Sequence, residues 1–212
     1  MMSKQLIVDY LPFEVTKEQI NESIKQNNGR LVVHGVLQRS DAKNQNGRVY
    51  PHGILQRESN KYAENFISQK RAMGELDHPE SSVVNLQNVS HNITEMHFEG
   101  LNLLGTVEIL TTPSGNILRE LFKNGIKLGI SSRGMGSVET VDEGDGEQPS
   151  MKVGQDFELI AFDFVSNPST HGAFLSPTNE GKLNEGKVGT RDGVCCHDCK
   201  IENIINDIFR GE

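Results

Sequence analysis

The sequence has no long apolar run and no excess of basic residues. No uninterrupted hydrophobic stretch approaches the roughly 18 residues that span a bilayer, so we expect no membrane segment. The 21 lysines and arginines are outnumbered by 29 acidic residues, which leaves a formal net charge of −8. Because sequence-independent nucleic-acid binding depends on Lys and Arg neutralising phosphates, no nucleic-acid partner is expected. The first residues carry no signal-peptide core, which predicts a cytosolic protein.

Cysteine is scarce, and its placement excludes a disulfide scaffold. The three cysteines fall within five residues, so they cannot cross-link the body of a fold. Together with one histidine they form a cluster that could bind Zn²⁺, made of Cys195, Cys196, His197 and Cys199. A structural zinc site usually has two ligand pairs separated by a folded loop, and a second pair is missing. We therefore expect no metal, and a zinc-binding module stays as an alternative for this segment.

The composition changes near residue 176, which predicts a body over 1–175 and a tail over 176–212. In the tail, the sequence Asn-Glu-Gly-Lys recurs within a few residues and offers few apolar anchors. A segment of this composition is expected to be a flexible linker. A short amphipathic helix is predicted at 201–209, close to the end of the chain.

The body is predicted to be an α+β protein with mostly antiparallel strands. Apolar runs and alternation predict strands at 6–10, 31–37, 83–89, 93–98, 101–110, 126–130 and 157–165. Helix-start patterns predict short helices at 16–26, 50–66 and 117–122. Many short strands with few short helices favour a small α+β fold or a mostly-β barrel.

The first candidate for chemistry is His78, in the stretch Gly-Glu-Leu-Asp-His-Pro at 74–79. The proline after it restricts the backbone, and a histidine is the natural general base near neutral pH. An isolated loop histidine with solvated acidic neighbours is nevertheless the commoner case. This motif alone therefore decides nothing.

The second candidate is a pair of serines in Gly-Ile-Ser-Ser-Arg-Gly-Met-Gly at 129–136. Side chains alternate along a strand, so Ser132 continues the apolar face formed by Ile126, Leu128 and Ile130. Ser131 points the other way, with Arg133 on its side, and is the better candidate for a nucleophile. The flanking glycines would let a substrate approach closely, and nearby backbone N–H groups could form an oxyanion hole. A glycine-rich strand end with satisfied hydroxyls is the alternative.

The third candidate is Asp163, a carboxylate inside the apolar run of 157–165. Burying a carboxylate is costly unless it is paired, and a catalytic histidine would be such a partner. Glu158 and Asp77 are rivals for the same role. The order His, Ser, Asp is compatible with a catalytic triad, but spacing alone cannot prove that the three meet.

Four motifs, in this order along the chain, resemble those of the prohead core proteases of T-even-type tailed phages. They are Asn-Gly-Arg-Val-Tyr-Pro at 46–51, the His78 motif, the Ser131 motif, and Asp163 followed by Asn-Pro-Ser at 167–169. The resemblance covers about 31–175. The family is similar in fold and mechanism to the herpesvirus assembly proteases. It implies a small, mostly antiparallel β-barrel edged by short helices.

The resemblance also implies roles for the three candidates. The activity that it implies needs no cofactor. His78 would be the general base, Ser131 the nucleophile and Asp163 the third member, where herpesvirus enzymes use a second histidine. The backbone N–H groups of Ser132, Arg133 and Gly134, which lie beside the nucleophile, would stabilise the oxyanion together with the Arg133 side chain. The expected activity is a serine endopeptidase acting inside the immature capsid in the host cytoplasm. Its expected substrates are scaffold or core proteins, the major capsid protein and finally itself.

Phage members of the family tend to cut after Glu with Leu or Ile two residues earlier. Such a site in the predicted tail, Leu-Asn-Glu at 183–185, leads us to expect self-cleavage after Glu185. Glu22 is a second candidate. The main alternative is a non-catalytic capsid-assembly or scaffold-associated protein with the same fold. A small-molecule serine hydrolase is disfavoured because no nucleophile-elbow pattern is present. Whether the chain forms a homo-oligomer stays open.

Overall fold

The computed structural model describes residues 4–79, 81–142 and 149–166, and the statements below concern these residues. Their strands are β1 (Gln5–Phe13), β2 (Leu31–Arg39), β3 (Arg48–Val49), β4 (Met73–Glu75), β5 (Val89–Glu99), β6 (Asn102–Ile109), β7 (Leu128–Gly136), β8 (Val138–Val141), β9 (Ser150–Val153) and β10 (Glu158–Val165). Their helices are α1 (Lys17–Gln26), α2 (His52–Tyr62), α3 (Pro113–Lys123) and the π-helical turn η1 (Ala63–Ile67). The predicted tail and its boundary near 175 lie outside the described residues.

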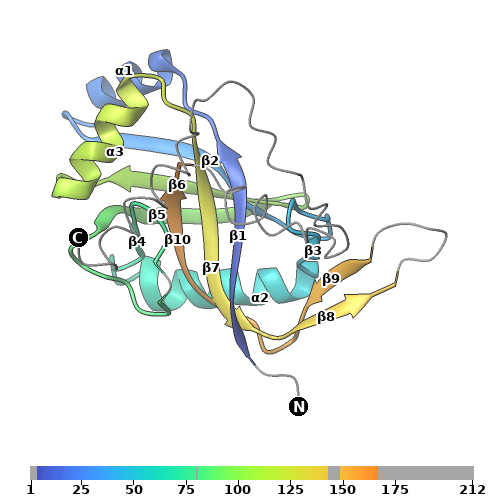
Figure 1. Cartoon of the computed structure of the whole chain (residues 1–212). Coiled ribbons are helices and arrows are strands. Elements are labelled where there is room, and N and C mark those ends of the chain that lie inside the picture. Colours follow the sequence, from blue (N-terminus) through green and yellow to red (C-terminus); the bar gives the residue numbers. More distant parts are fainter. Residues whose placement is uncertain (1–3, 80, 143–148, 167–212) are drawn as a thin grey trace, which may run out of the picture. The chain divides into compact units, whose positions relative to one another are not determined.

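The strands form three sheets. The first has the order β1-β7-β10 and the second the order β2-β6-β5-β4, and both are antiparallel throughout. The third, β3-β9-β8, contains one parallel pair, β3 with β9. Figure 1 shows the strands of the first sheet crossing those of the second, with α1 and α3 beside each other and α2 along another edge. The predicted α+β class with mostly antiparallel strands is confirmed.

A closed barrel is not found among the described residues. The two larger sheets are joined by one isolated parallel bridge, between Leu76 and Phe164, and β1 packs against β2 without a ladder between them. The expected barrel is therefore interrupted, because the chain leaves strand geometry immediately after β4. Asp77, with a positive φ of 67°, marks that change of direction.

Most predicted helices are present, for the expected reasons. Thr16 accepts a hydrogen bond from the Gln19 N–H, and the Gln19 side chain accepts one from the Thr16 N–H, which is the capping box that begins α1. Thr112 caps α3 by accepting a hydrogen bond from the Gly115 N–H, with Pro113 at the first helical position. The predicted helix at 50–66 is α2 continued by η1. No helix in the described part of the chain has the length and apolarity needed to cross a membrane.

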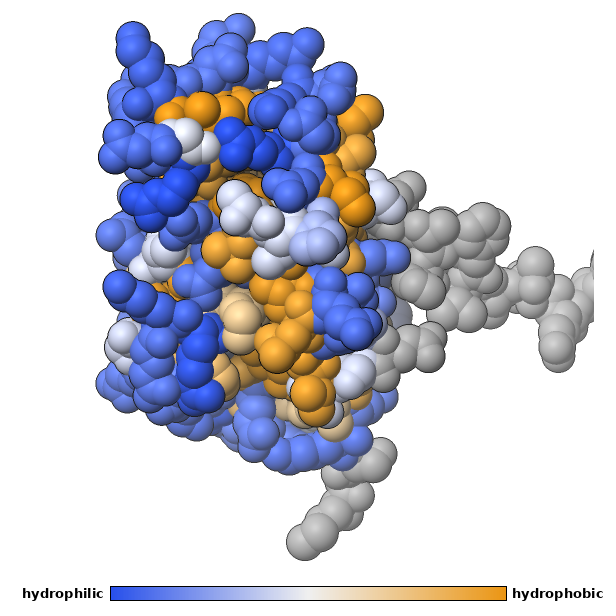
Figure 2. All heavy atoms as spheres, turned by 90° about the vertical axis from the view of Figure 1, so that its left-hand side faces the viewer, coloured by the Kyte–Doolittle hydropathy of each residue, from blue (hydrophilic) through white to orange (hydrophobic). Residues whose placement is uncertain are grey.

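The predicted strand at 83–89 is wrong except for its last residue. The segment between β4 and β5 is a series of turns, and its apolar side chains Val83 and Leu86 are 71% and 69% exposed. Its backbone polar groups bind buried charged side chains instead of a neighbouring strand, as described below. Figure 2, which faces the left side of Figure 1, shows apolar atoms reaching the surface between hydrophilic rims.

The hydrophobic core lies between the two larger sheets and uses one face of each. From the first sheet it takes Ile7, Phe13, Leu128, Ile130, Leu159, Phe162 and Phe164. Phe164 forms edge-to-face contacts with Phe13 at 5.2 Å and with Phe122 at 5.4 Å between ring centroids. Because β7 and β10 give their apolar side chains to this face, their polar residues are left on the opposite one.

Candidate active site

The two serines of β7 lie on opposite faces of the first sheet. Ser131 is opposite Tyr10 of β1 and Asp163 of β10, whereas Ser132 is opposite Asp9 and Phe162. Residues directly opposite each other in antiparallel strands share a face. Ser131 and Asp163 are therefore neighbours on the face turned away from the core, as the alternation in the sequence predicted for Ser131.

Ser132 is held in a satisfied polar network. It accepts a hydrogen bond from Gln38 Nε2 at 2.7 Å and donates to the carbonyl of Asp9 at 3.3 Å. All three residues are buried. A hydroxyl that is committed in this way on the core side of the sheet is a structural group.

The motif at 46–51 supports the same network from behind. Asn46 Nδ2 and Arg48 Nη1 donate to Asp9 Oδ1 at 2.7 and 2.9 Å, and the Tyr50 hydroxyl donates to Asp9 Oδ2. Burial and the neighbouring Asp9 charge raise the pKa of the Tyr50 hydroxyl well above its ordinary value. The sequence argument missed Asp9, although a carboxylate in the apolar run of β1 was the same signal that singled out Asp163.

Ser131 differs from Ser132 in having no partner. Its side chain is 1% exposed, and Oγ has no hydrogen bond within the part of the chain that the structure describes. A buried hydroxyl without a partner is uncommon and calls for an explanation such as a catalytic role. The absence of a side chain at Gly129 makes room for the Tyr10 ring beside Ser131, since a Cβ there would collide with that ring.

His78 is brought to Asp163 by the connection between the two sheets. The Leu76–Phe164 bridge and a hydrogen bond from the Asp77 N–H to the Phe164 carbonyl, 2.8 Å, fix the chain beside β10. His78 Nδ1 then lies 3.5 Å from Asp163 Oδ2, and the histidine side chain is 12% exposed. Asp163, the predicted third member of the triad, thus lies beside His78, the predicted base.

The rival carboxylates are engaged elsewhere. Asp77 Oδ1 accepts the N–H of His78 itself at 2.9 Å, which shapes the turn. Glu158 is exposed and pairs with Lys4 at 3.0 Å. Among the three acidic candidates, Asp163 is the one that an ion-pair distance joins to His78.

Asp163 is fully buried in a cluster of charges that the sequence did not reveal. Its Oδ2 lies 2.9 Å from Arg133 Nε, and its Oδ1 accepts hydrogen bonds from Arg133 Nη2 at 3.1 Å and from the Glu75 N–H at 3.0 Å. Arg133 Nη2 also donates to Glu75 Oε1 at 3.0 Å. Burial raises the pKa of Asp163 to about 6, while Arg133 acts in the opposite direction.

The expected role of the Arg133 side chain at an oxyanion is corrected by these contacts. The guanidinium is 0% exposed, and its three nitrogens contact Asp163, Glu75 and the carbonyl of Ser81. Arg133 is on the Ser131 face, as predicted, but it points into the cluster of carboxylates. It holds protein groups in place and has no exposed surface to offer a substrate.

The backbone N–H groups expected to form the oxyanion hole lie in the middle strand of a sheet. Ser132, Arg133 and Gly134 each have ladder partners on both β1 and β10. The pairing with β10 is irregular between Leu159 and Ala161, opposite Gly134 and Arg133. That irregularity is where a ladder N–H in this stretch could be released.

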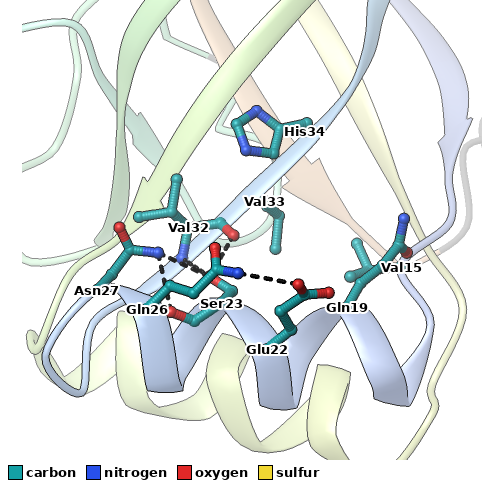
Figure 3. A pocket seen from close by; sticks show the side chains of 9 residues that line it. All are labelled: Val15, Gln19, Glu22, Ser23, Gln26, Asn27, Val32, Val33 and His34. Atoms are coloured by element: carbon teal, nitrogen blue, oxygen red, sulfur yellow. Dashed lines mark hydrogen bonds between the residues drawn. The ribbon is translucent and has the colours of Figure 1, made fainter.

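The remaining predicted sites fall away from this cluster or outside the described residues. Glu22 lies in α1, whose Ile20 is 1% exposed, so cleavage after Glu22 would require the helix to open. Figure 3 shows Glu22 in a groove between α1 and β2 that contains none of the predicted catalytic residues. The other predicted sites lie outside the described residues: the cleavage site Glu185 and the cluster of Cys195, Cys196, His197 and Cys199. No metal-binding group of His, Cys, Asp or Glu occurs among the residues that are described.

Comparisons with known proteins agree with the fold. The chain is 29% identical over 150 residues to the prohead core protein protease of Enterobacteria phage T4, covering 69% of this chain and 68% of that protein. It is similar to the solved structure of the bacteriophage T4 capsid assembly protease, with a TM-score of 0.65 and 23% identity. That match covers 78% of this chain and 99% of the other, and it shows a shared fold.

A family model described as prohead core protein serine protease matches residues 5–185. The matched range contains every described element and the cluster around Asp163. Because it covers most of the sequence, the chain belongs to the prohead core protein serine protease family.

Proposed function

We propose that the chain is a serine endopeptidase of phage capsid maturation, with Ser131 as nucleophile, His78 as general base and Asp163 as the residue that orients the base. The observation that carries the proposal is that Ser131 and Asp163 share one face of the first sheet and that His78 lies beside Asp163. Ser131 is directly opposite Asp163, His78 Nδ1 is 3.5 Å from Asp163 Oδ2, and Ser131 Oγ is buried without a described partner.

The proposed mechanism follows from which atoms are occupied. Nδ1 of His78 faces Asp163, so we assign to Nε2 the task of taking the proton of Ser131. Ser131 Oγ then attacks the scissile carbonyl, and Asp163 stabilises the imidazolium that forms. His78 returns the proton to the leaving amine, and water releases the acyl group by the reverse sequence. Backbone N–H groups near the β7–β10 irregularity would bind the oxyanion.

The proposed substrates follow from the family and the T4 relative. A prohead core protease acts inside the immature capsid, on scaffold or core proteins and the major capsid protein. We include self-cleavage after Glu185, which would remove the segment after it, and a preference for Leu or Ile two residues before a Glu. We also propose that the protease domain spans residues 1–175 and is related in fold to the herpesvirus assembly proteases, and the two crossed antiparallel sheets support this.

The test compares two adjacent serines. The wild-type chain and the Ser131→Ala and Ser132→Ala variants are incubated, and intact masses are recorded. We expect loss of the segment after Glu185 from wild type and from Ser132→Ala, and an intact Ser131→Ala chain. Cleavage that persists in Ser131→Ala would contradict the nucleophile. A Glu185→Gln variant that is still cut at the same bond would contradict the preference for Glu.

Burial of Ser131 also fits the second candidate, a capsid-assembly protein with this fold and no catalysis. A fluorophosphonate probe separates the two proposals, because it reacts with an activated serine and does not need a substrate protein. A mass increase on wild type that is lost in Ser131→Ala supports the protease. No labelling of wild type, with or without added scaffold protein, supports the assembly protein.

A further inference from the structure

We propose that Arg133 and Glu75 are positioning residues of the active site: Arg133 fixes Asp163 and the segment after His78, and Glu75 shares the charge of Arg133 so that the cluster beside His78 has an excess of negative charge. The inference rests on the proposed function, since it assigns a task to residues that contact its third member. It concerns residues that do not touch a substrate.

The first step is the hold on Asp163. Arg133 contacts both carboxylate oxygens: Nη2 donates a hydrogen bond to Oδ1 at 3.1 Å, and Nε forms an ion pair with Oδ2 at 2.9 Å without hydrogen-bond geometry. The backbone N–H of Glu75 adds a third contact at 3.0 Å. A planar guanidinium that binds both oxygens fixes the plane of the carboxylate as well as its position. The direction in which Oδ2 faces His78 is therefore set by Arg133.

The second step is the hold on the chain that carries the base. Arg133 Nη1 donates to the carbonyls of Ser81 at 2.6 Å and Val83 at 3.5 Å. Glu75 Oε1 accepts the N–H of Asn85 at 3.0 Å. These residues follow His78 in the segment between β4 and β5, where the predicted strand is missing. The same two charges thus anchor both the orienting carboxylate and the stretch that follows the base.

The third step is the charge balance. Among the described residues, Arg133 is the one Lys or Arg in contact with Asp163, and it faces two carboxylates that are 0% exposed. Glu75 Oε2 has no hydrogen bond within the described residues, so Oε1 and its bonds to Arg133 and Asn85 compensate the Glu75 charge. Because the charge of Arg133 is shared between Glu75 and Asp163, the cluster carries an excess of one negative charge next to His78. An excess negative charge there favours the imidazolium that forms during catalysis.

The groups that face Asp163 come from four directions. They are Arg133 of β7, Glu75 of β4, His78 after β4, and Tyr62 of α2, whose pKa is raised by burial and by the Asp163 charge. Glu75 raises the pKa of Asp163 and Arg133 lowers it. Removing Glu75 should therefore lower the pKa of Asp163, and removing Arg133 should raise it.

The test measures that titration directly and needs no proteolysis. In a Ser131→Ala background, the side-chain carboxyl carbons of aspartate are labelled with ¹³C and followed by NMR against pH, with Asp163→Asn identifying the signal. We expect Glu75→Gln to lower the apparent pKa of Asp163 from about 6, and Arg133→Gln to raise it. Arg133→Lys keeps the charge and loses the fork, so it should fall between wild type and Arg133→Gln.

A matched control removes a comparable ion pair on the other face of β7. Arg48→Gln breaks the pair with buried Asp9, 2.9 Å apart, and should leave the Asp163 titration unchanged. An unchanged Asp163 titration in Glu75→Gln, or a shift in the same direction in the Glu75 and Arg133 variants, would overturn the proposal. If Arg133→Gln does not fold, Glu75→Gln and Arg133→Lys still decide it.

A second readout connects the cluster to catalysis. On a peptide with a Leu-Asn-Glu site, Glu75→Gln with Ser131 intact should move the acid limb of kcat to lower pH and leave KM within about twofold. Arg133→Lys should move that limb to higher pH and lower kcat at neutral pH by about tenfold or more. A chain without any Ser131-dependent activity contradicts the proposed function, while the NMR titrations still report on the positioning residues. Altered KM with unchanged pH limbs contradicts the inference itself.

Discussion

Replacing Gly74 by alanine is expected to loosen the contact between the two larger sheets. Gly74 in β4 is opposite His91 in β5, and a Cβ at Gly74 would collide with the backbone carbonyl of Phe162 in β10 and with the His91 ring. That ring binds the same carbonyl through Nε2 at 2.9 Å. The added methyl group must therefore move β4 away from β10 or break this bond, because a backbone carbonyl inside a ladder cannot turn aside.

The magnitude follows from these two contributions. Overpacking a well-packed position costs about 1–3 kcal/mol, and leaving a buried hydrogen-bonding group without its partner costs about 1–3 kcal/mol. For a domain of this size, about 2–5 kcal/mol corresponds to a fall of about 5–15 °C in Tm. His78 follows β4 after three residues, so the His78–Asp163 geometry should change as well, and proteolysis should fall by about a hundredfold.

The assay is thermal unfolding of Gly74→Ala in a Ser131→Ala background, where self-cleavage cannot interfere. Gly53→Ala is the matched control, because Gly53 lies in α2 and a Cβ there meets nothing within 4 Å. Alanine in a helix should raise stability by about 0.5–1 kcal/mol. A Gly74→Ala variant that melts within about 2 °C of its parent would refute the close approach of β4 to β10.

Three further outcomes are expected. Peptide cleavage should decline as pH falls through about 6, because protonated Asp163 no longer supports His78, and kcat profiles in matched buffers measure this. Burial lowers the pKa of His91 to about 4, so the stability that neutral His91 contributes is present above about pH 6.5 and lost as pH falls. The raised pKa of Asp163 acts in the opposite direction. The stability that protonated Asp163 contributes is present below about pH 3.8 and lost as pH rises through about 6. Urea unfolding should therefore show that a His91→Gln variant loses less stability than wild type as pH falls from 6.5 to 4, and equal pH dependence of the two chains would contradict the buried neutral state of His91. Thr16→Ala should lower the free energy of unfolding by about 1 kcal/mol through loss of the α1 cap, with proteolysis at neutral pH unchanged.

Sequence patterns predicted those features of the fold and the candidate site that depend on only a few neighbouring residues. Alternation along a strand is independent of its partners, so the opposite orientation of Ser131 and Ser132 could be deduced before the sheet was known. The capping box at Thr16 is likewise contained in four residues. The single signal for Asp163, a carboxylate in an apolar run, located a buried charge correctly.

The sequence could not show what buried charges bind, because partners come from distant segments. Arg133 was given a role at an oxyanion, yet its contacts are Asp163, Glu75 and the carbonyls of the segment between β4 and β5. That segment was predicted as a strand for its apolar residues. The backbone polar groups of this segment instead bind the side chains of Arg133 and Glu75. A local sequence pattern cannot show that side chains take the place of a neighbouring strand.

The single bridge between Leu76 and Phe164 has a consequence for when the protein can act. His78 arrives with the sheet that ends in β4, whereas Ser131 and Asp163 belong to the sheet of β7 and β10. Either sheet alone holds an incomplete set of the proposed catalytic groups. Under the proposed mechanism, a newly made chain becomes a protease only after its two halves have docked, so incompletely folded copies cannot cut their neighbours.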